Sequence, residues 1–173
     1  MTTTVVRRRT GARVAIPLGF AVFALGVWAA VVPLVGPYFD FGFDTDQTWV
    51  WSEQHWTLSI IPGVVAAVAG IMMAFPTRFR MGALLGALAG AWLAVGPFLH
   101  PLWSDAVAPI ATGDGKRAAL WVCYFTGAGV LIAYLCGLGS MISRGAEHVV
   151  TDADDGVTSR RSAPAEEREV AIR

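Results

Sequence analysis

Charged side chains are scarce in this chain of 173 residues. They make up 15% of it, against roughly 25% in an ordinary soluble domain. Hydrophobic residues make up 55%, and the mean hydropathy of +0.55 is too high for a soluble protein of this size. The 13 basic and 13 acidic residues cancel, so no net charge attracts a polyanion. The composition therefore excludes a disordered protein, a nucleic-acid binder and a small secreted scaffold.

The charges are spaced so that four long windows contain none. No Asp, Glu, Lys or Arg occurs in residues 14–39, 54–77, 81–104 and 118–143. Each window suffices for one membrane crossing, which needs about 20 apolar residues, and is too short for two. None has the polar face that a helix of a soluble bundle presents. We therefore predict an all-α membrane protein with four transmembrane helices, near residues 14–36, 57–77, 81–100 and 118–142.

The first apolar window follows three arginines and is not a cleaved signal peptide. Its run from Val14 to Gly36 exceeds the usual apolar region of about 7–15 residues. Basic residues in the short connections then set the orientation. Seven lie on one side: Arg7, Arg8, Arg9, Arg13, Arg78, Arg80 and Arg144. The other side has two, Lys116 and Arg117, so we predict that both termini lie in the cytoplasm.

The domain organisation follows from these spans. Residues 1–13 form a cytoplasmic segment, mobile up to residue 12. Residues 14–77 form a first hairpin, with an aromatic and acidic outer connection at 37–56. Residues 78–143 form a second hairpin with an outer connection at 101–117. Residues 144–173 are rich in charge and poor in apolar side chains, which predicts a disordered cytoplasmic tail.

The two cysteines form no disulfide framework. Cys123 and Cys136 lie on one predicted helix, 13 residues apart. At 1.5 Å per residue they are about 20 Å apart, far beyond the roughly 5.5 Å separation of a disulfide. We expect both to be packing residues.

One motif recurs after 64 residues. Its copies contain Gly26, Trp28, Pro33 and Pro37, then Gly90, Trp92, Pro97 and Pro101. The same offset, without a gap, pairs Gly63 with Gly127 and Ala69 with Ala133. A shared Trp and two shared Pro are much less common by chance than Ala or Val matches. We therefore predict two tandem helical hairpins, a parallel internal repeat, in contrast to the inverted repeats of many transporters.

These copies resemble the SPW repeat of bacterial membrane proteins. The shared pattern is a helix ending in G-x-W-x-x-x-[small]-P-aromatic, followed by a helix with a central Gly. The resemblance covers residues 20–75 and 84–139. It departs at the Ser of the motif, which is Val32 and Gly96 here, and at the Trp after Pro, which is Leu34 and Phe98. It implies a protein built from helix pairs and implies no activity.

Three groups of residues are candidates for packing or function. Gly82, Gly86 and Gly90 lie four apart on one helix face, which lets another helix approach closely; we expect that helix to belong to the same chain. Pro33 and Pro97 are expected to stop their helices at the interface, or else to break them beside a site. His55 and His100 are weak cofactor candidates, and interfacial histidines in contact with water are the expected alternative.

No span contains a buried carboxylate, Lys or Arg, and the chain contains no phosphate loop, nucleophile elbow or HExxH motif. We predict no catalytic residue, metal or cofactor. The leading hypothesis is a non-enzymatic accessory or structural subunit in the lipid bilayer that associates through helix faces and the outer connection 37–56, as a homo-oligomer or in a membrane protein complex. A second is a small transporter or channel component with a site near Pro33 and Pro97. A third is a haem or redox protein that uses His55 and His100.

Overall fold

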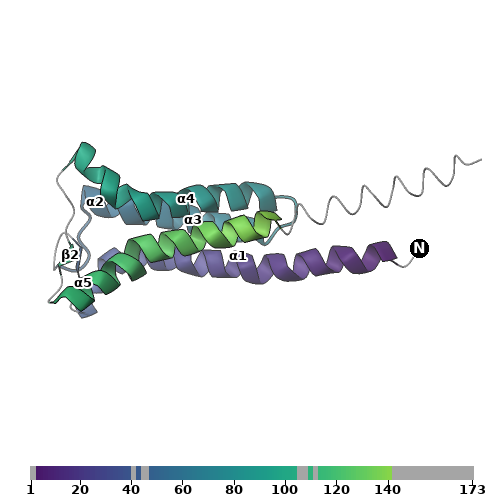
Figure 1. Cartoon of the computed structure of the whole chain (residues 1–173), viewed down its shortest axis with the longest axis horizontal. Helices are drawn as coiled ribbons and strands as arrows, with labels where there is room; N and C mark the ends of the chain where they lie inside the picture. The colour runs from purple at the N-terminus through teal and green to yellow at the C-terminus, as the bar shows by residue number, and fades with distance from the viewer. Residues whose placement is uncertain (1–2, 40–41, 44–46, 105–108, 111–112, 142–173) are drawn as a thin grey trace, which may run out of the picture. The chain divides into compact units, whose positions relative to one another are not determined.

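The computed structural model describes residues 3–39, 42–43, 47–104, 109–110 and 113–141 (Figure 1). Its first half contains α1 (Thr3–Val35), η1 (Gly36–Phe39), β1 (Gly42–Phe43), α2 (Glu53–His55), η2 (Trp56–Ile60) and α3 (Ile61–Met73). Its second half contains α4 (Phe79–Leu99), η3 (His100–Leu102), β2 (Pro109–Ile110), α5 (Asp114–Leu120) and η4 (Trp121–Thr126). The last described helix, residues 127–141, continues from η4. The segments η1 and η3 are 3₁₀-helical, and η2 and η4 are π-helical.

Four helices are long and apolar enough to cross a membrane. They are Val14–Phe39, Glu53–Met73, Phe79–Leu102 and Asp114–Met141. The prediction of a helical chain with four such spans is confirmed. The sequence did not predict the small ladder in which Gly42 pairs with Ile110 and Phe43 with Pro109. This antiparallel pairing joins the two long connections to each other.

The helix boundaries differ from the expected ones mainly at the starts. Helix α1 begins at Thr3, so residues 3–13 are helical where the sequence predicts a mobile segment. The second span begins at Glu53, because the side chain of Ser52 accepts a hydrogen bond from the His55 N–H at 3.3 Å and caps the helix. The fourth begins at Asp114, so the expected connection 101–117 is shorter. The predicted disordered tail, 144–173, lies outside the described residues.

Glycines bring α1 and α3 into backbone contact. A Cβ atom on Gly19 would lie 2.6 Å from the carbonyl O of Gly70, and one on Gly63 would lie 2.8 Å from the carbonyl O of Gly26. The two pairs are seven residues apart on each helix and run in opposite directions, so the helices are antiparallel. In lipid, where apolar burial gives helices little drive to associate, such close packing holds them together.

The other helices close the bundle through similar contacts. A Cβ on Gly90 would lie 2.6 Å from the carbonyl O of Gly129, which pairs α4 with residues 127–141. A Cβ on Gly82 would lie 2.7 Å from the carbonyl O of Ala69, which pairs α4 with α3. The core between the helices includes Val22, Met73, Leu93, Ile132 and Cys136, all of them fully buried.

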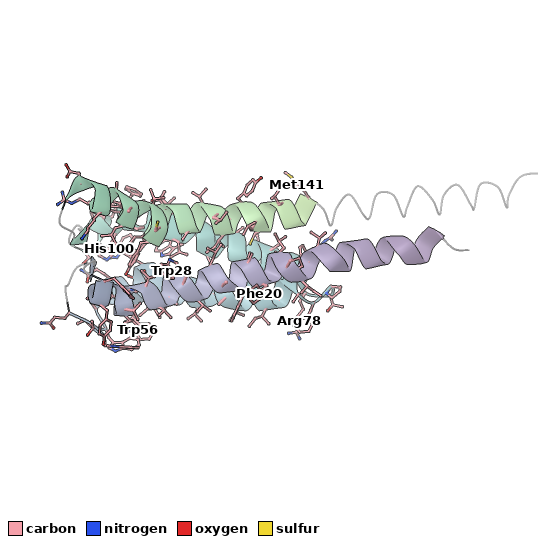
Figure 2. All side chains as sticks on the ribbon, turned by 90° about the horizontal axis from the view of Figure 1, so that it is seen from below. Phe20, Trp28, Trp56, Arg78, His100 and Met141 are labelled. Atoms are coloured by element: carbon pink, nitrogen blue, oxygen red, sulfur yellow. The ribbon has the colours of Figure 1, made fainter. Side chains whose placement is uncertain are left out.

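The two ends of the bundle differ in structure (Figure 1). One end, which we call the loop end, carries η1, β1, α2, η3, β2 and the start of α5. Toward the other end lie the short turn at residues 74–78, between α3 and α4, the start of α1 and the last described residues before Met141 (Figure 1, Figure 2). The polar and aromatic features that follow are at the loop end.

Candidate functional site

Two π-helical segments lie near the loop end. Segment η2 (Trp56–Ile60) precedes α3, and segment η4 (Trp121–Thr126) follows α5. A π-helix bonds each N–H to the carbonyl five residues earlier, which widens the helix and shifts its carbonyls out of the α-helical pattern. Such segments are rare and often occur at functional sites.

Each π segment accepts a hydrogen bond from a tryptophan of another span. The indole Nε1 of Trp92, on α4, donates to the carbonyl O of Thr57 at 2.9 Å. The indole Nε1 of Trp28, on α1, donates to the carbonyl O of Cys123 at 3.3 Å. The two hydrogen bonds are equivalent in their arrangement: one joins the first span to the fourth, and the other joins the third span to the second. The sequence marks both tryptophans but gives no sign of their acceptors.

The contacts correct the register of the repeat in its second helices. Gly63 lies against Gly26, and Gly129 lies against Gly90 in the same way. The matching residue of Gly63 is therefore Gly129, at an offset of 66. The contacts do not bear out the sequence pairing of Gly63 with Gly127, because the three atoms nearest to a Cβ on Gly127 all belong to Val122 of its own helix. Segments rich in Gly and Ala align almost as well when shifted by two residues, whereas backbone contact permits a single register.

The pairing of Ala69 with Ala133 changes for the same reason. A Cβ on Gly26 would meet the backbone of Ala67, and one on Gly90 would lie 2.8 Å from the backbone N of Ala133. Ala133 therefore corresponds to Ala67, again at an offset of 66. In the first helices, Gly26 and Gly90 make equivalent contacts at an offset of 64.

The two candidate histidines are buried. His55 is 1% exposed and His100 is 0% exposed, so the expectation of interfacial histidines in contact with water is wrong. The early start of the second span explains His55, which lies in a helical turn instead of a loop. Its Nδ1 lies 2.7 Å from the carbonyl O of Val50, and the ring of His100 meets the edge of Trp103 at 5.4 Å. Figure 2 shows His100 at the same end of the bundle as Trp56.

Neither histidine belongs to a cluster of metal ligands. Among the described residues, no group of three or more His, Cys, Asp or Glu side chains is placed to hold a metal ion. Two polar residues of the π segments, Ser59 in η2 and Tyr124 in η4, are also buried, at 1% and 2% exposure, and sequence reasoning did not select them. A Ser and a Tyr inside apolar windows are the only sequence signal for them.

The prolines do not break their helices. Helix α1 continues through Pro33 to Val35, and α4 continues through Pro97 to Leu99. Each then tightens into a 3₁₀ turn, η1 or η3. Both helices are thus continuous at Pro33 and Pro97.

The glycine stripe of α4 faces the chain's own helices. Gly82 lies against Ala69 of α3, and Gly90 lies against Gly129. Between them, a Cβ on Gly86 would lie 2.6 Å from the Sγ of Cys136 and 3.4 Å from the Cβ of Ala69. Val22 of α1 also lies within contact distance of that Cβ, at 3.7 Å, so the stripe lies in the middle of the bundle and faces all three other spans.

An apolar pocket of about 310 Å³ opens beside Trp28. It is lined by Trp28, Val32, Phe39, Lys116, Ala119, Leu120, Cys123 and Tyr124. These residues come from α1 and η1 on one side and from α5 and η4 on the other. One cation, Lys116, is the only charged side chain in this lining.

The surface of the loop end is aromatic and apolar. Its exposed large side chains include Tyr38, Phe39, Trp49, Trp51, Trp56, Leu102 and Trp103. Trp51 and Trp56 lie in ring contact at 5.3 Å, and the Nε1 of Trp49 donates to the hydroxyl of Tyr38 at 3.3 Å. The arrangement offers binding surface. No family model, curated protein or solved structure matches the chain.

Proposed function

We propose that the chain is a non-enzymatic accessory or structural subunit of a bacterial cytoplasmic membrane. It associates with a partner membrane protein through the aromatic surface of the loop end. The observation that carries this proposal is the gathering of exposed Trp, Tyr and Phe side chains at this end, with Trp51 55% exposed and Leu102 79% exposed. Aromatic residues are enriched at the centres of protein interfaces, although a membrane boundary also attracts them.

The interior of the bundle supports a structural role. Backbones touch at Gly26 and Gly63, and again at Gly90 and Gly129, so side chains and backbone fill the middle of the bundle. Charged residues within the four spans lie close to their ends: Glu53, Arg80, Asp114, Lys116 and Arg117. Transport proteins usually place ionisable groups along an intramembrane pathway.

The proposal includes two tandem copies of one helix pair, with both termini in the cytoplasm. The same contacts recur in both hairpins, which supports the proposal of two copies. Within each hairpin two glycines on different helices touch, and from each hairpin a Trp indole donates a hydrogen bond to the π segment of the other hairpin. This arrangement also agrees with the resemblance to the SPW repeat. An experimental structure tests it, since Trp28 should superpose on Trp92 while Gly63 superposes on Gly129. Unrelated depths for these pairs would contradict it.

The function is tested by purifying the tagged chain in mild detergent and identifying its stable partners. We expect a defined complex that the double variant Trp51→Ala/Leu102→Ala weakens, because both side chains are exposed at the loop end. Phe75→Ala is the matched control, since Phe75 is 55% exposed in the turn at the opposite end. Loss of the complex in the control alone, or the absence of any complex, would contradict the proposal. A visible absorption spectrum of the same sample tests the haem hypothesis.

A further inference from the structure

The pocket beside Trp28 has a buried floor and an exposed rim. Its floor consists of Val32, Leu120 and Tyr124, which are 1%, 7% and 2% exposed. Its rim includes Trp28 and Phe39, which are 49% and 69% exposed. The volume of about 310 Å³ lies within the range of about 300–1,000 Å³ that is usual for small-molecule sites. A pocket of this kind accepts an apolar group that enters from the side of the bundle.

The single cation of the pocket is available to a ligand. Lys116 lies in the first turn of α5, where the fourth span begins. The neighbouring Arg117 does not line the pocket and lies 4.0 Å from the carboxylate of Asp114. Within the part of the chain that the structure describes, Lys116 has no such ion pair. A cation at the end of a span, beside an apolar pocket, is complementary to an amphiphile with a negative head group.

The corresponding place on the other helix pair lacks both features. Trp103 stacks on the indole of Trp92 there, with ring centroids 6.3 Å apart, and covers the face that the pocket leaves open at Trp28. With the offset of 66, Lys116 corresponds to Val50, and Ala119 corresponds to Glu53. At the second place an aromatic ring therefore lies on the indole, and the matching positions hold a valine and a carboxylate instead of a lysine and an alanine. The difference within one molecule indicates that the pocket at Trp28 is not a general consequence of the fold.

We propose that this pocket binds one anionic phospholipid of the surrounding leaflet. An acyl chain lies over Val32 and Leu120 against the indole of Trp28, and the phosphate lies beside the ammonium group of Lys116. Trp28 is held in place for this contact, because its Nε1 donates to the carbonyl O of Cys123. The lipid covers the seam between α1 and the fourth span at the loop end.

Native mass spectrometry of the full chain in detergent tests the proposal. The probes are phosphatidylglycerol and phosphatidylcholine with identical acyl chains. We expect phosphatidylglycerol to bind more tightly, and Lys116→Gln to weaken its binding by about fivefold, since one basic residue near the surface contributes about that much to the affinity for anionic lipid. Arg117→Gln is the matched control: it removes the same charge one residue away, outside the pocket, and should bind like the unmodified chain.

Alkylation by a maleimide locates the lipid. Cys123 is exposed and lines the pocket, whereas Cys136 is fully buried, so Cys123 reports on the site. Phosphatidylglycerol should slow its alkylation in the unmodified chain and in Arg117→Gln, and should do so less in Lys116→Gln. Inorganic phosphate should give no protection.

Several outcomes would overturn this assignment. Equal binding of the two lipids, or equal loss in Lys116→Gln and Arg117→Gln, would remove the role of Lys116. Protection of Cys123 that rises with protein concentration in the absence of lipid would identify a second copy of the chain as the occupant. None of these measurements depends on a partner protein, so this proposal and the proposed subunit function succeed or fail separately.

Discussion

At the scale of single residues, glycine decides how closely the helices of this bundle pack. A Cβ on Gly63 would lie 2.6 Å from the backbone N of Ala30, a separation that real Cβ atoms do not reach, so the helices would have to move apart. Gly137 is the opposite case, since a Cβ there would meet nothing within 4 Å. Glycine is an unfavourable helix residue, so it stabilises the structure only where its missing side chain permits contact.

Gly63→Ala and Gly137→Ala are therefore expected to change stability in opposite directions. The first should lower the free energy of unfolding by about 1–3 kcal/mol, the usual cost of overpacking. The second should raise it by about 0.5–1 kcal/mol through helix propensity. Thermal unfolding in one detergent measures both. A Gly63→Ala protein as stable as Gly137→Ala would show that α1 and α3 do not touch at this point.

Gly86→Leu tests the middle of the stripe on α4. A leucine there must displace Cys136 and Ala69, so we expect a lower melting temperature, with a loss of about 1–3 kcal/mol. Leu84→Ile is the control, because Leu84 is 58% exposed on another face of the same helix. If Gly86→Leu melts like the unmodified protein and keeps its oligomeric state, α4 packs through a different face.

At the scale of elements, the π segments η2 and η4 connect spans that are distant in the sequence. Each turns a backbone carbonyl toward an indole, from Thr57 to Trp92 and from Cys123 to Trp28. An α-helix buries its carbonyls in its own hydrogen bonds, so the wider π turn provides an acceptor that a regular helix lacks. In an apolar setting an indole N–H needs such a partner.

Trp92→Phe should lower stability by about 1 kcal/mol, the usual net value of one hydrogen bond. Trp28→Phe should cost less, because its bond is longer, 3.3 Å against 2.9 Å. Trp56→Phe serves as the control, since the contact shown for Trp56 is with the ring of Trp51 and a phenyl ring preserves it. Unfolding midpoints of the three variants under one condition give the comparison. An order with Trp56→Phe as the most destabilised variant would contradict the role of the indole bonds.

At the scale of the whole molecule, the two long connections meet at one end, where β1 pairs with β2. The opposite end has the turn between α3 and α4, beside Arg78 and Arg80, and the start of α1 (Figure 1). The first and last described residues, Thr3 and Met141, lie toward the same end as this turn (Figure 1, Figure 2). The excess of basic residues there is the basis for the cytoplasmic location that we propose for this end.

Reporter fusions test this orientation. A reporter that is active only outside the cytoplasm should be silent when fused after Arg173 and active when inserted near Asp44. A reporter that is active only in the cytoplasm should give the reverse pattern and serves as the control. Activity of the first reporter after Arg173, with silence near Asp44, would invert the assignment.

The sequence alone predicts the four spans, because a charge in hydrocarbon is costly and the positions without charge are visible in the chain. It also marks Trp28, Trp92 and the glycines of α4 as special. Those signals are local, since each depends on residues within one helix or on one repeated spacing.

Tertiary structure decides what these residues touch. Four features each depend on two or more spans. They are the contact of Gly63 with Gly26, the hydrogen-bond acceptors of the two indoles, the burial of His55 and His100, and the pocket beside Trp28. When two helices rich in Gly, Ala, Val and Leu pack together, many relative registers would bring nearly the same set of residue types into contact. Only the close approach of the backbones distinguishes them, because a shift of two residues replaces a glycine by a side chain that does not fit.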